Sequence, residues 1–356
     1  MNHLHQIRQQ LKSYDLEAML ITGEAGEFYA VGFQGEGVVL VTETGSWYST
    51  DSRYIESAEK QIADCNILLI GKGKGHLTLA AEEIARQGIS RIGIQEEAMT
   101  IAEHKRWVEV LGEDCQLIPS GQLVAQLRAS KDEEELKCMQ EAQAITDKTF
   151  AEILNHIRPG ETEQEIAAKI TYYQMKFGAS KNSFDPIVVS GANGSLPHGI
   201  PSAKPIQAGE FVTMDFGSMV GGYCSDMTRT VAVGQPTEEM ELVYHTVLEA
   251  QLTGISMAKA GVIGADVDAA ARKVIEQAGY GEYFGHGLGH SLGIEIHESP
   301  NFSAGCKEPI PAGAVLSVEP GIYLPGKMGV RIEDVVWLEE GGCKVLTKSP
   351  KELIVL

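Results

Sequence analysis

Residues Phe211–Val233 read FVTMDFGSMVGGYCSDMTRTVAV, and they carry the clearest structural pattern in the chain. The stretch consists of an apolar run, a glycine-containing turn and a second apolar run, which is the pattern of a β-hairpin. Asp215 and Asp226 interrupt the two runs. Two buried carboxylates on one hairpin are costly without a cation between them, because both lose water and repel each other. The stretch therefore indicates either a metal site or a pair of structural carboxylates.

The position of the turn distinguishes these two interpretations. If the hairpin turns at Val220-Gly221, Asp215 lies directly opposite Asp226, with Cβ atoms about 5 Å apart. If it turns one residue later, at Gly221-Gly222, the acids fall out of register and make separate hydrogen bonds. The sequence leaves both registers open.

A glycine-rich segment from Gly285 to Glu298, GHGLGHSLGIEIHE, holds three candidate histidines. His286 and His290 have the i, i+4 spacing of one helix face, but the surrounding glycines disfavour a helix. We expect a looped or extended backbone in which His290 reaches a metal and His286 lines the cavity. His297 follows an alternating segment, and by itself it would be interpreted as a surface residue of an edge strand.

Two further acids interrupt apolar stretches near the C-terminus. Glu319 lies in LSVEPGIY and Glu333 in GVRIEDVVWL, where Arg331 shares a strand face with Glu333. Alone, that pair would indicate a salt bridge. Together with the residues above, four carboxylates and one imidazole without thiolates favour two divalent ions such as manganese, cobalt, iron or zinc. Two metals roughly 3.5 to 4 Å apart hold a bridging hydroxide and polarise a carbonyl, which is hydrolytic chemistry.

The chain as a whole divides into two parts. Between Leu16 and about Leu123, short apolar runs alternate with helical stretches, which predicts an α/β layered domain. The charged segment Arg128–Glu135, RASKDEEE, ends this pattern. We therefore expect an N-terminal domain over residues 1–127 and a C-terminal domain over residues 128–356.

Two helices are expected after this boundary. We interpret the acids of RASKDEEE as the solvated first turn of a helix that runs to about His156, with Ser130 as its cap. Thr162, with a glutamate three residues later, is a capping-box signature for a helix to about Phe177.

Composition excludes several classes of function. The 356 residues carry a formal net charge of −20, which opposes binding to nucleic acids and anionic membranes. No stretch approaches the roughly 18 apolar residues of a membrane span, and residues 1–14 lack the apolar run of a signal peptide. The six cysteines are scattered, which fits reduced thiols, and Cys224 is expected to be buried and inert. We expect a soluble, cytoplasmic protein.

The ordered motifs resemble those of the Xaa-Pro peptidase family, which contains aminopeptidase P and prolidase and shares the pita-bread fold with methionine aminopeptidase and creatinase. The C-terminal resemblance is carried by LPHGIPS, MDFGSMVGGYCSDMTRT, GHGLGHSLGIEIHE, VEPGIY and VRIEDVV. FYAVGFQGEGVVLVT and YSTDSRY carry a weaker N-terminal resemblance. The resemblance implies an α+β protein in which a pita-bread catalytic domain follows a smaller, creatinase-type α/β domain.

The resemblance also implies a set of metal ligands. In the numbering of this chain they are Asp215, Asp226, His290, Glu319 and Glu333. Asp226 and Glu333 are expected to bridge two ions, with manganese expected first and cobalt, zinc or iron as alternatives. Glu319 is also expected to handle the proton of the attacking hydroxide.

Further residues are implied in catalysis and substrate binding. His198 and His297 match the histidines that stabilise the tetrahedral intermediate and pass a proton to the leaving proline nitrogen. His286 matches a histidine near the proline ring. Tyr323 and Arg331 match residues that orient the ligands, and they are expected to support substrate binding as well.

The function implied is hydrolysis of the bond between an N-terminal residue and proline in small peptides, by a homodimer. Dipeptides and longer substrates are not separated by the sequence. Creatinase is a poor match because no ligand position is substituted, and the extra N-terminal domain disfavours methionine aminopeptidase. The alternatives are a non-catalytic peptide-binding module on the same fold and a same-fold aminopeptidase of other specificity.

Overall fold

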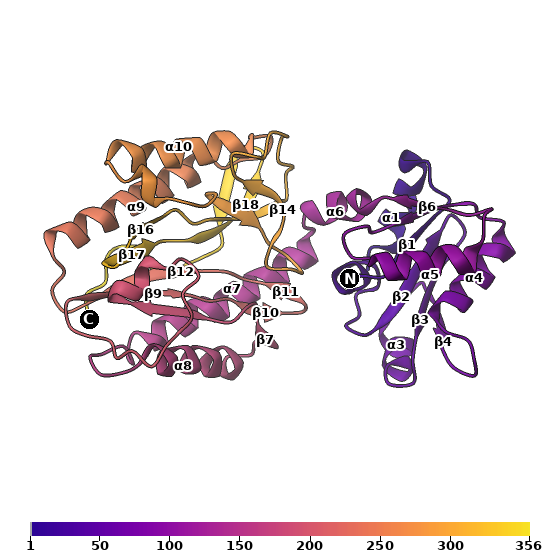
Figure 1. Ribbon diagram of the computed structural model, residues 1–356, viewed down its shortest axis with the longest axis horizontal. Coiled ribbons are helices and arrows are strands. Elements are labelled where there is room, and N and C mark those ends of the chain that lie inside the picture. Colours follow the sequence, from indigo (N-terminus) through magenta and orange to yellow (C-terminus); the bar gives the residue numbers. More distant parts are fainter. Residues whose placement is uncertain (1) are drawn as a thin grey trace. The chain divides into compact units, whose positions relative to one another are not determined.

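The computed structural model describes residues 2–356, and the chain folds into two compact units. The first ends at Arg128 and the second runs from Ala129 to Leu356, as the change from purple to magenta and orange marks in Figure 1. Across the described residues, no helix combines the length and the apolar character that crossing a membrane requires.

The first unit is built on a six-stranded mixed sheet with strand order β4-β3-β2-β1-β5-β6. Its strands are β1 (Ala18–Ile21), β2 (Gly37–Thr42), β3 (Ser46–Thr50), β4 (Asn66–Leu69), β5 (Arg91–Ile94) and β6 (Gln116–Pro119). Its helices are α1 (Leu4–Gln10), the 3-10 turn η1 (Leu11–Tyr14), α2 (Glu24–Val31), α3 (Ile55–Gln61), α4 (His76–Gln87), α5 (Ile101–Leu111) and α6 (Gly121–Ala129). Because β1 pairs parallel with β5 and antiparallel with β2, the predicted α/β layers are confirmed.

The core of this unit follows the apolar runs of the sequence. Leu20 and Ile92 of the sheet are buried with Ile84 of α4 and Trp107 of α5 in one cluster. Each strand therefore contributes one apolar face to the layer that the helices cover.

The second unit contains four helices, two short 3-10 turns and thirteen strands among the described residues. The helices and turns are α7 (Glu133–Ile153), α8 (Glu163–Lys176), η2 (Gly191–Ser195), α9 (Glu238–Met257), α10 (Gly264–Gln277) and η3 (Gly281–Tyr283). The strands are β7 (Lys181–Asn182), β8 (Ile187–Ser190), β9 (Glu210–Asp215), β10 (Ser218–Val220), β11 (Tyr223–Cys224), β12 (Thr228–Val233), β13 (Gly289–Ser291), β14 (Glu298–Phe302), β15 (Val315–Val318), β16 (Gly321–Leu324), β17 (Met328–Arg331), β18 (Asp334–Glu339) and β19 (Gly342–Val345).

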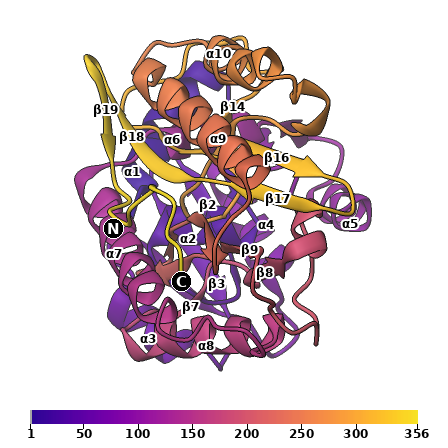
Figure 2. The same cartoon turned by 90° about the vertical axis from the view of Figure 1, so that its left-hand side faces the viewer.

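Two helix pairs enclose the strands of this unit. Phe150 of α7 packs in one core cluster with Val212 of β9, whereas Val247 of α9 packs in another with Leu316 of β15. In Figures 1 and 2, α9 and α10 lie on one side of the strands and α8 on the other. The second unit therefore has two halves, each a helix pair packed on its own sheet, with strands between the helix pairs.

The starts of two helices follow from their capping residues. Asp132 is the N-cap of α7 and forms a capping box with Glu135, so the prediction of Ser130 as cap was wrong. The Ser130 hydroxyl instead donates to the carbonyl oxygen of Ala312 at 2.7 Å. The capping box at Thr162, which begins α8, is confirmed.

The hairpin between β9 and β12 takes the later of the two registers. It turns at Gly221-Gly222, where both residues have the left-handed φ values, 57° and 86°, that favour glycine. Asp215 therefore pairs with Thr228, and the direct opposition of Asp215 and Asp226 is wrong. Since Thr228 and Asp226 are two residues apart, both acids still lie on the same face of the hairpin.

One acidic side chain is buried in the first unit. Glu27, in the interior of α2, is 5% exposed. Burial raises the pKa of its carboxyl to about 8, although a hydrogen bond from the Gly37 backbone works against this shift. Between its usual pKa of about 4.5 and pH 8, the folded protein keeps a proton on Glu27 that the unfolded chain has lost.

We predict that Glu27→Gln removes a pH-dependent loss of stability. The free energy of unfolding of the wild type should fall by up to about 1.4 kcal/mol per pH unit between pH 4.5 and 8, and should not fall further above pH 8. The reason is that the unfolded chain releases the Glu27 proton at a lower pH than the folded protein does. Urea unfolding, followed by tryptophan fluorescence, should show that the free energy of unfolding of the variant rises relative to that of the wild type over this pH range only. For the control Glu59→Gln, at an exposed site, the curve of unfolding free energy against pH should be parallel to that of the wild type. A parallel curve for Glu27→Gln would contradict the prediction.

Candidate metal centre and active site

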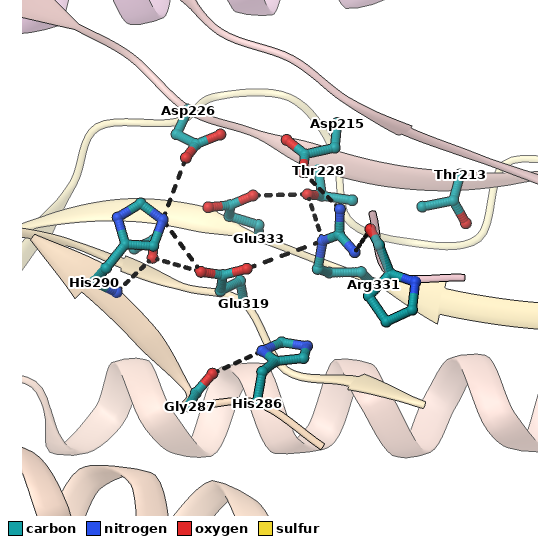
Figure 3. Close-up of polar contacts among 12 residues, drawn as sticks. Thr213, Asp215, Asp226, Thr228, His286, Gly287, His290, Glu319, Arg331 and Glu333 are labelled. Carbon is teal, nitrogen blue, oxygen red and sulfur yellow. Dashed lines mark hydrogen bonds and ion pairs between the residues drawn. The ribbon is translucent and has the colours of Figure 1, made fainter. Parts of the chain in front are cut away.

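The five predicted ligand positions lie in or close to strands from both halves of the second unit. They are Asp215 at the end of β9, Asp226 before β12, His290 in β13, Glu319 after β15 and Glu333 before β18. Figure 3 shows their side chains around a common space. The fold therefore gathers residues that are as much as 118 positions apart in the chain, from 215 to 333.

His290 presents an unprotonated nitrogen to this space. Its Nδ1 lies 3.1 Å from the carbonyl oxygen of Ser291, which can only accept, so Nδ1 carries the proton. Nε2 then faces Asp226 Oδ2 at 3.6 Å and Glu319 Oε1 at 3.3 Å. Burial lowers the pKa of His290, which favours this neutral form. A nitrogen lone pair facing two carboxylate oxygens is the arrangement that a metal ion between them would satisfy.

Several carboxylate oxygens in the same space lack partners. Within residues 2–356, Asp215 Oδ1, Asp226 Oδ1 and Glu333 Oε1 are buried without a hydrogen bond. Ligand atoms of Asp226, His290 and Glu333 lie within 4.8 Å of one another. Burial, and then repulsion from neighbouring acids, raises the pKa values of Asp226 and Glu333. Because unpaired buried charges are costly, the residues present fit divalent cations.

Arg331 orders part of this cluster. Its Nη2 donates to Asp215 Oδ2 at 2.6 Å and its Nη1 to the Tyr323 hydroxyl at 2.9 Å. Its Nε donates to the Thr228 hydroxyl, which donates in turn to Glu333 Oε2 at 2.7 Å. Arg331 thus pairs directly with Asp215 and reaches Glu333 only through Thr228, so both acids are oriented without their free oxygens being consumed.

A cavity of about 450 Å³ opens onto the cluster. His198, His286 and His297 line it together with apolar side chains such as Phe184 and Ile187. The His286 ring is fixed, because Nδ1 lies 2.8 Å from the Gly287 carbonyl oxygen and Nε2 lies 2.9 Å from the Tyr323 hydroxyl. The cavity therefore combines an apolar wall with imidazoles beside the carboxylates.

The other two imidazoles that line the cavity belong to His198 and His297. Within the described part of the chain, neither His198 nor His297 makes a hydrogen bond, and the His297 ring lies edge-to-face against His290 with centroids 4.4 Å apart. Burial lowers the pKa of His297. Both rings are thus available to a bound molecule.

Some supporting residues were missed by the sequence analysis. Glu163 is fully buried and accepts hydrogen bonds from Asn193 and Ser202, which flank the loop that carries His198. In the sequence it looks like any acid at a helix start, and no local signal distinguishes it. Thr228 could have been noted, because it shares a strand face with Asp226. Cys224 is buried as predicted, with its thiol pKa raised by burial to about 12.

Comparisons with known proteins agree with this architecture. The model of metallopeptidase family M24 matches residues 137–340, and that of the creatinase/prolidase N-terminal domain matches residues 3–130. A Xaa-Pro dipeptidase from Pyrococcus horikoshii is 35% identical over 95% of each chain. Among solved structures, a Xaa-Pro dipeptidase from Bacillus anthracis has a TM-score of 0.95 at 40% identity over 99% of each chain. An X-Pro aminopeptidase from Thermotoga maritima has a TM-score of 0.93 at 37% identity over 100% of each chain.

We predict opposite effects of Asp226→Asn on stability and on metal binding. In metal-stripped protein the variant should be more stable than the wild type by about 1 kcal/mol or more, because it removes a buried carboxyl whose ionisation burial and neighbouring acids oppose. Its affinity for manganese should fall at least about 100-fold, more than the loss of a supporting residue would cause. Urea unfolding and isothermal titration calorimetry measure the two effects. Asp114→Asn, at an exposed site, should change neither, and unchanged manganese binding in Asp226→Asn would refute the assignment.

Proposed function

The chain belongs to metallopeptidase family M24, and we propose that it hydrolyses the peptide bond between an N-terminal residue and a following proline. Its fold is the predicted pita-bread domain preceded by a creatinase-type N-terminal domain. The observation that carries the proposal is the convergence of four carboxylates and an unprotonated imidazole nitrogen in one cluster that borders the cavity. The relatives named as Xaa-Pro dipeptidase and X-Pro aminopeptidase cover nearly the whole chain, which supports the same specificity here.

The proposed ligands are Asp215, Asp226, His290, Glu319 and Glu333, which would together hold two divalent ions, with Asp226 and Glu333 as the ligands that both ions would share. Oxygen donors with one imidazole favour manganese, with cobalt, zinc or iron as alternatives. When bound, such ions activate water for attack and polarise the carbonyl of the scissile bond. The unpaired oxygens of three of these carboxylates support this assignment.

Proton transfer falls to residues at the edge of the cluster. Glu319 Oε1 accepts a hydrogen bond from the Ser317 hydroxyl at 3.1 Å and lies beside the His290 nitrogen. A carboxylate held there can take the proton of the attacking water. His297 and His198, with free ring nitrogens in the cavity, can stabilise charge on the tetrahedral carbon's oxygen and protonate the leaving nitrogen.

Selectivity for proline follows from the shape of the cavity. The bond before proline is a tertiary amide without an N–H group, so a hydrogen bond to that position cannot recognise it. Phe184, Ile187 and Ile296 provide apolar surface in the cavity wall, and His286 lines the same cavity. A pocket of this kind recognises a ring by shape.

The remaining assignments rest on the family resemblance. We propose small peptides with proline in second position as substrates, a homodimer as the assembly and the cytoplasm as the location. The net charge of −20 supports the expectation that polyanions such as nucleic acids are not partners.

We predict that manganese-loaded protein releases the first residue from Ala-Pro, Ala-Pro-Gly or both. It should cleave Ala-Gly-Gly at least about 100-fold more slowly, which is the discrimination expected of a shaped pocket. Chromatographic detection of free alanine measures this. Chelation should abolish the release, because the nucleophile depends on the ions. If the protein cleaves neither proline peptide at full metal occupancy, the proposed function is refuted and a peptide-binding module is favoured.

We also predict that His297→Asn lowers kcat by about 100-fold or more while metal content is unchanged, because general acid catalysis contributes on that scale. Steady-state kinetics with metal analysis measure both quantities. His245→Asn, a matched change on the exposed surface of α9, should leave kcat as in the wild type. An equal effect of the two substitutions would contradict the role of His297.

A further inference from the structure

Lys131 is buried, although the acids that follow it in RASKDEEE were expected to form the solvated first turn of a helix. Its side chain is 1% exposed, and its Nζ lies 3.1 Å from Glu298 Oε2. The same Nζ lies 3.5 Å from the Ser291 hydroxyl. The Glu298 side chain is itself only 5% exposed. A buried ion pair often contributes little net stability, so stability alone does not explain why this pair is placed here.

The base of the Lys131 side chain is held by backbone contacts. The Lys131 N–H donates to the Gly313 carbonyl oxygen at 2.9 Å, and Asp132, the next residue, is the N-cap of α7. Gly313 has a left-handed φ of 80°, and a Cβ there would lie 2.5 Å from the Ser130 hydroxyl oxygen. The ammonium group therefore extends from a fixed point.

The far end of this ion pair, Glu298, is the first residue of β14 and lies directly after the loop from β13. Ser291 directly follows His290 and Glu298 directly follows His297, and the two residues pair across a register shift. Glu298 Oε1 accepts from the Glu295 N–H at 3.1 Å. A Cβ at Gly293 would lie 2.8 Å from Glu298 Oε2, so the carboxylate fills the inside of the loop.

The placement of His297 depends on this loop. Among the residues that the structure describes, its ring makes no hydrogen bond, and its contact with His290 is a ring contact at 4.4 Å. The backbone of residues 292–297 must therefore determine where the ring lies. That backbone closes around the Glu298 carboxylate, which Lys131 holds from outside the loop.

We propose that Lys131, acting through Glu298, is a positioning residue that orders residues 292–297 and fixes the His297 ring beside His290. The effect on turnover rests on the proposed function, whereas the effect on loop order does not. Lys131 does not line the cavity, and its ammonium group contacts Glu298 and the hydroxyl of Ser291, so it would act on the site through these two neighbours.

The test compares Lys131→Met with Lys137→Met, the same chemical change at an exposed position on α7. Hydrogen exchange of the amides of residues 292–297 should be at least about tenfold faster in Lys131→Met, the rate change that corresponds to losing about 1.4 kcal/mol of local order. With Ala-Pro or Ala-Pro-Gly, kcat per folded, metal-loaded molecule should fall about 10- to 100-fold, as for other supporting residues, with KM within about threefold. Lys137→Met should match the wild type in both measurements.

Glu298→Gln serves as a second variant in case Lys131→Met does not fold, because it keeps the size of the side chain and the acceptor for Glu295. It should accelerate exchange in the same loop, by less than Lys131→Met. Unchanged loop exchange in the folded variants would overturn the proposal, as would faster exchange with an unchanged kcat. If wild-type protein cleaves neither peptide, the proposed function fails, but the exchange rates still decide whether Lys131 orders the loop.

Discussion

Repulsion among buried carboxylates is the main energetic cost that the fold of the second unit has to accommodate. Asp226 and Glu333 are 4% and 1% exposed, and burial together with repulsion from neighbouring acids raises the pKa of each. Arg331 compensates Asp215 but leaves buried oxygens of all three acids without partners. A chain selected for stability alone would pair or remove these groups. Their retention marks a site where local stability is given up for chemistry.

The surrounding fold holds these groups in place because they sit on strand ends rather than on free loops. The Glu333 N–H donates to the Thr228 carbonyl oxygen at 3.1 Å, which joins the two halves at the cluster itself. Gly289 approaches the Ser317 carbonyl so closely that a Cβ would lie 2.0 Å from it. The residue before His290 is therefore restricted to glycine, and precise ligand placement follows from close backbone packing.

The sequence allowed prediction of features that depend on local pattern. The capping box at Thr162 and the extended backbone at His290 are examples, since each depends on a few neighbouring residues. The hairpin register was not determined, because moving the turn by one residue shifts the pairing by two and leaves both acids on the same face. The burial of Lys131 was not predicted, because its charged segment resembles a solvated helix start and its partner Glu298 is 167 residues away. Contacts of that range leave no mark in local composition.

The distribution of ligands over both halves has a consequence for the lifetime of the protein. An ion held by Asp226 from one half and by His290 and Glu333 from the other would join them, and its binding free energy would add to the free energy of unfolding. Metal-starved molecules would then open more often and expose cleavable segments more frequently. Supply of the ion would thus regulate how much of the protein persists in a cell, in addition to how fast each molecule works.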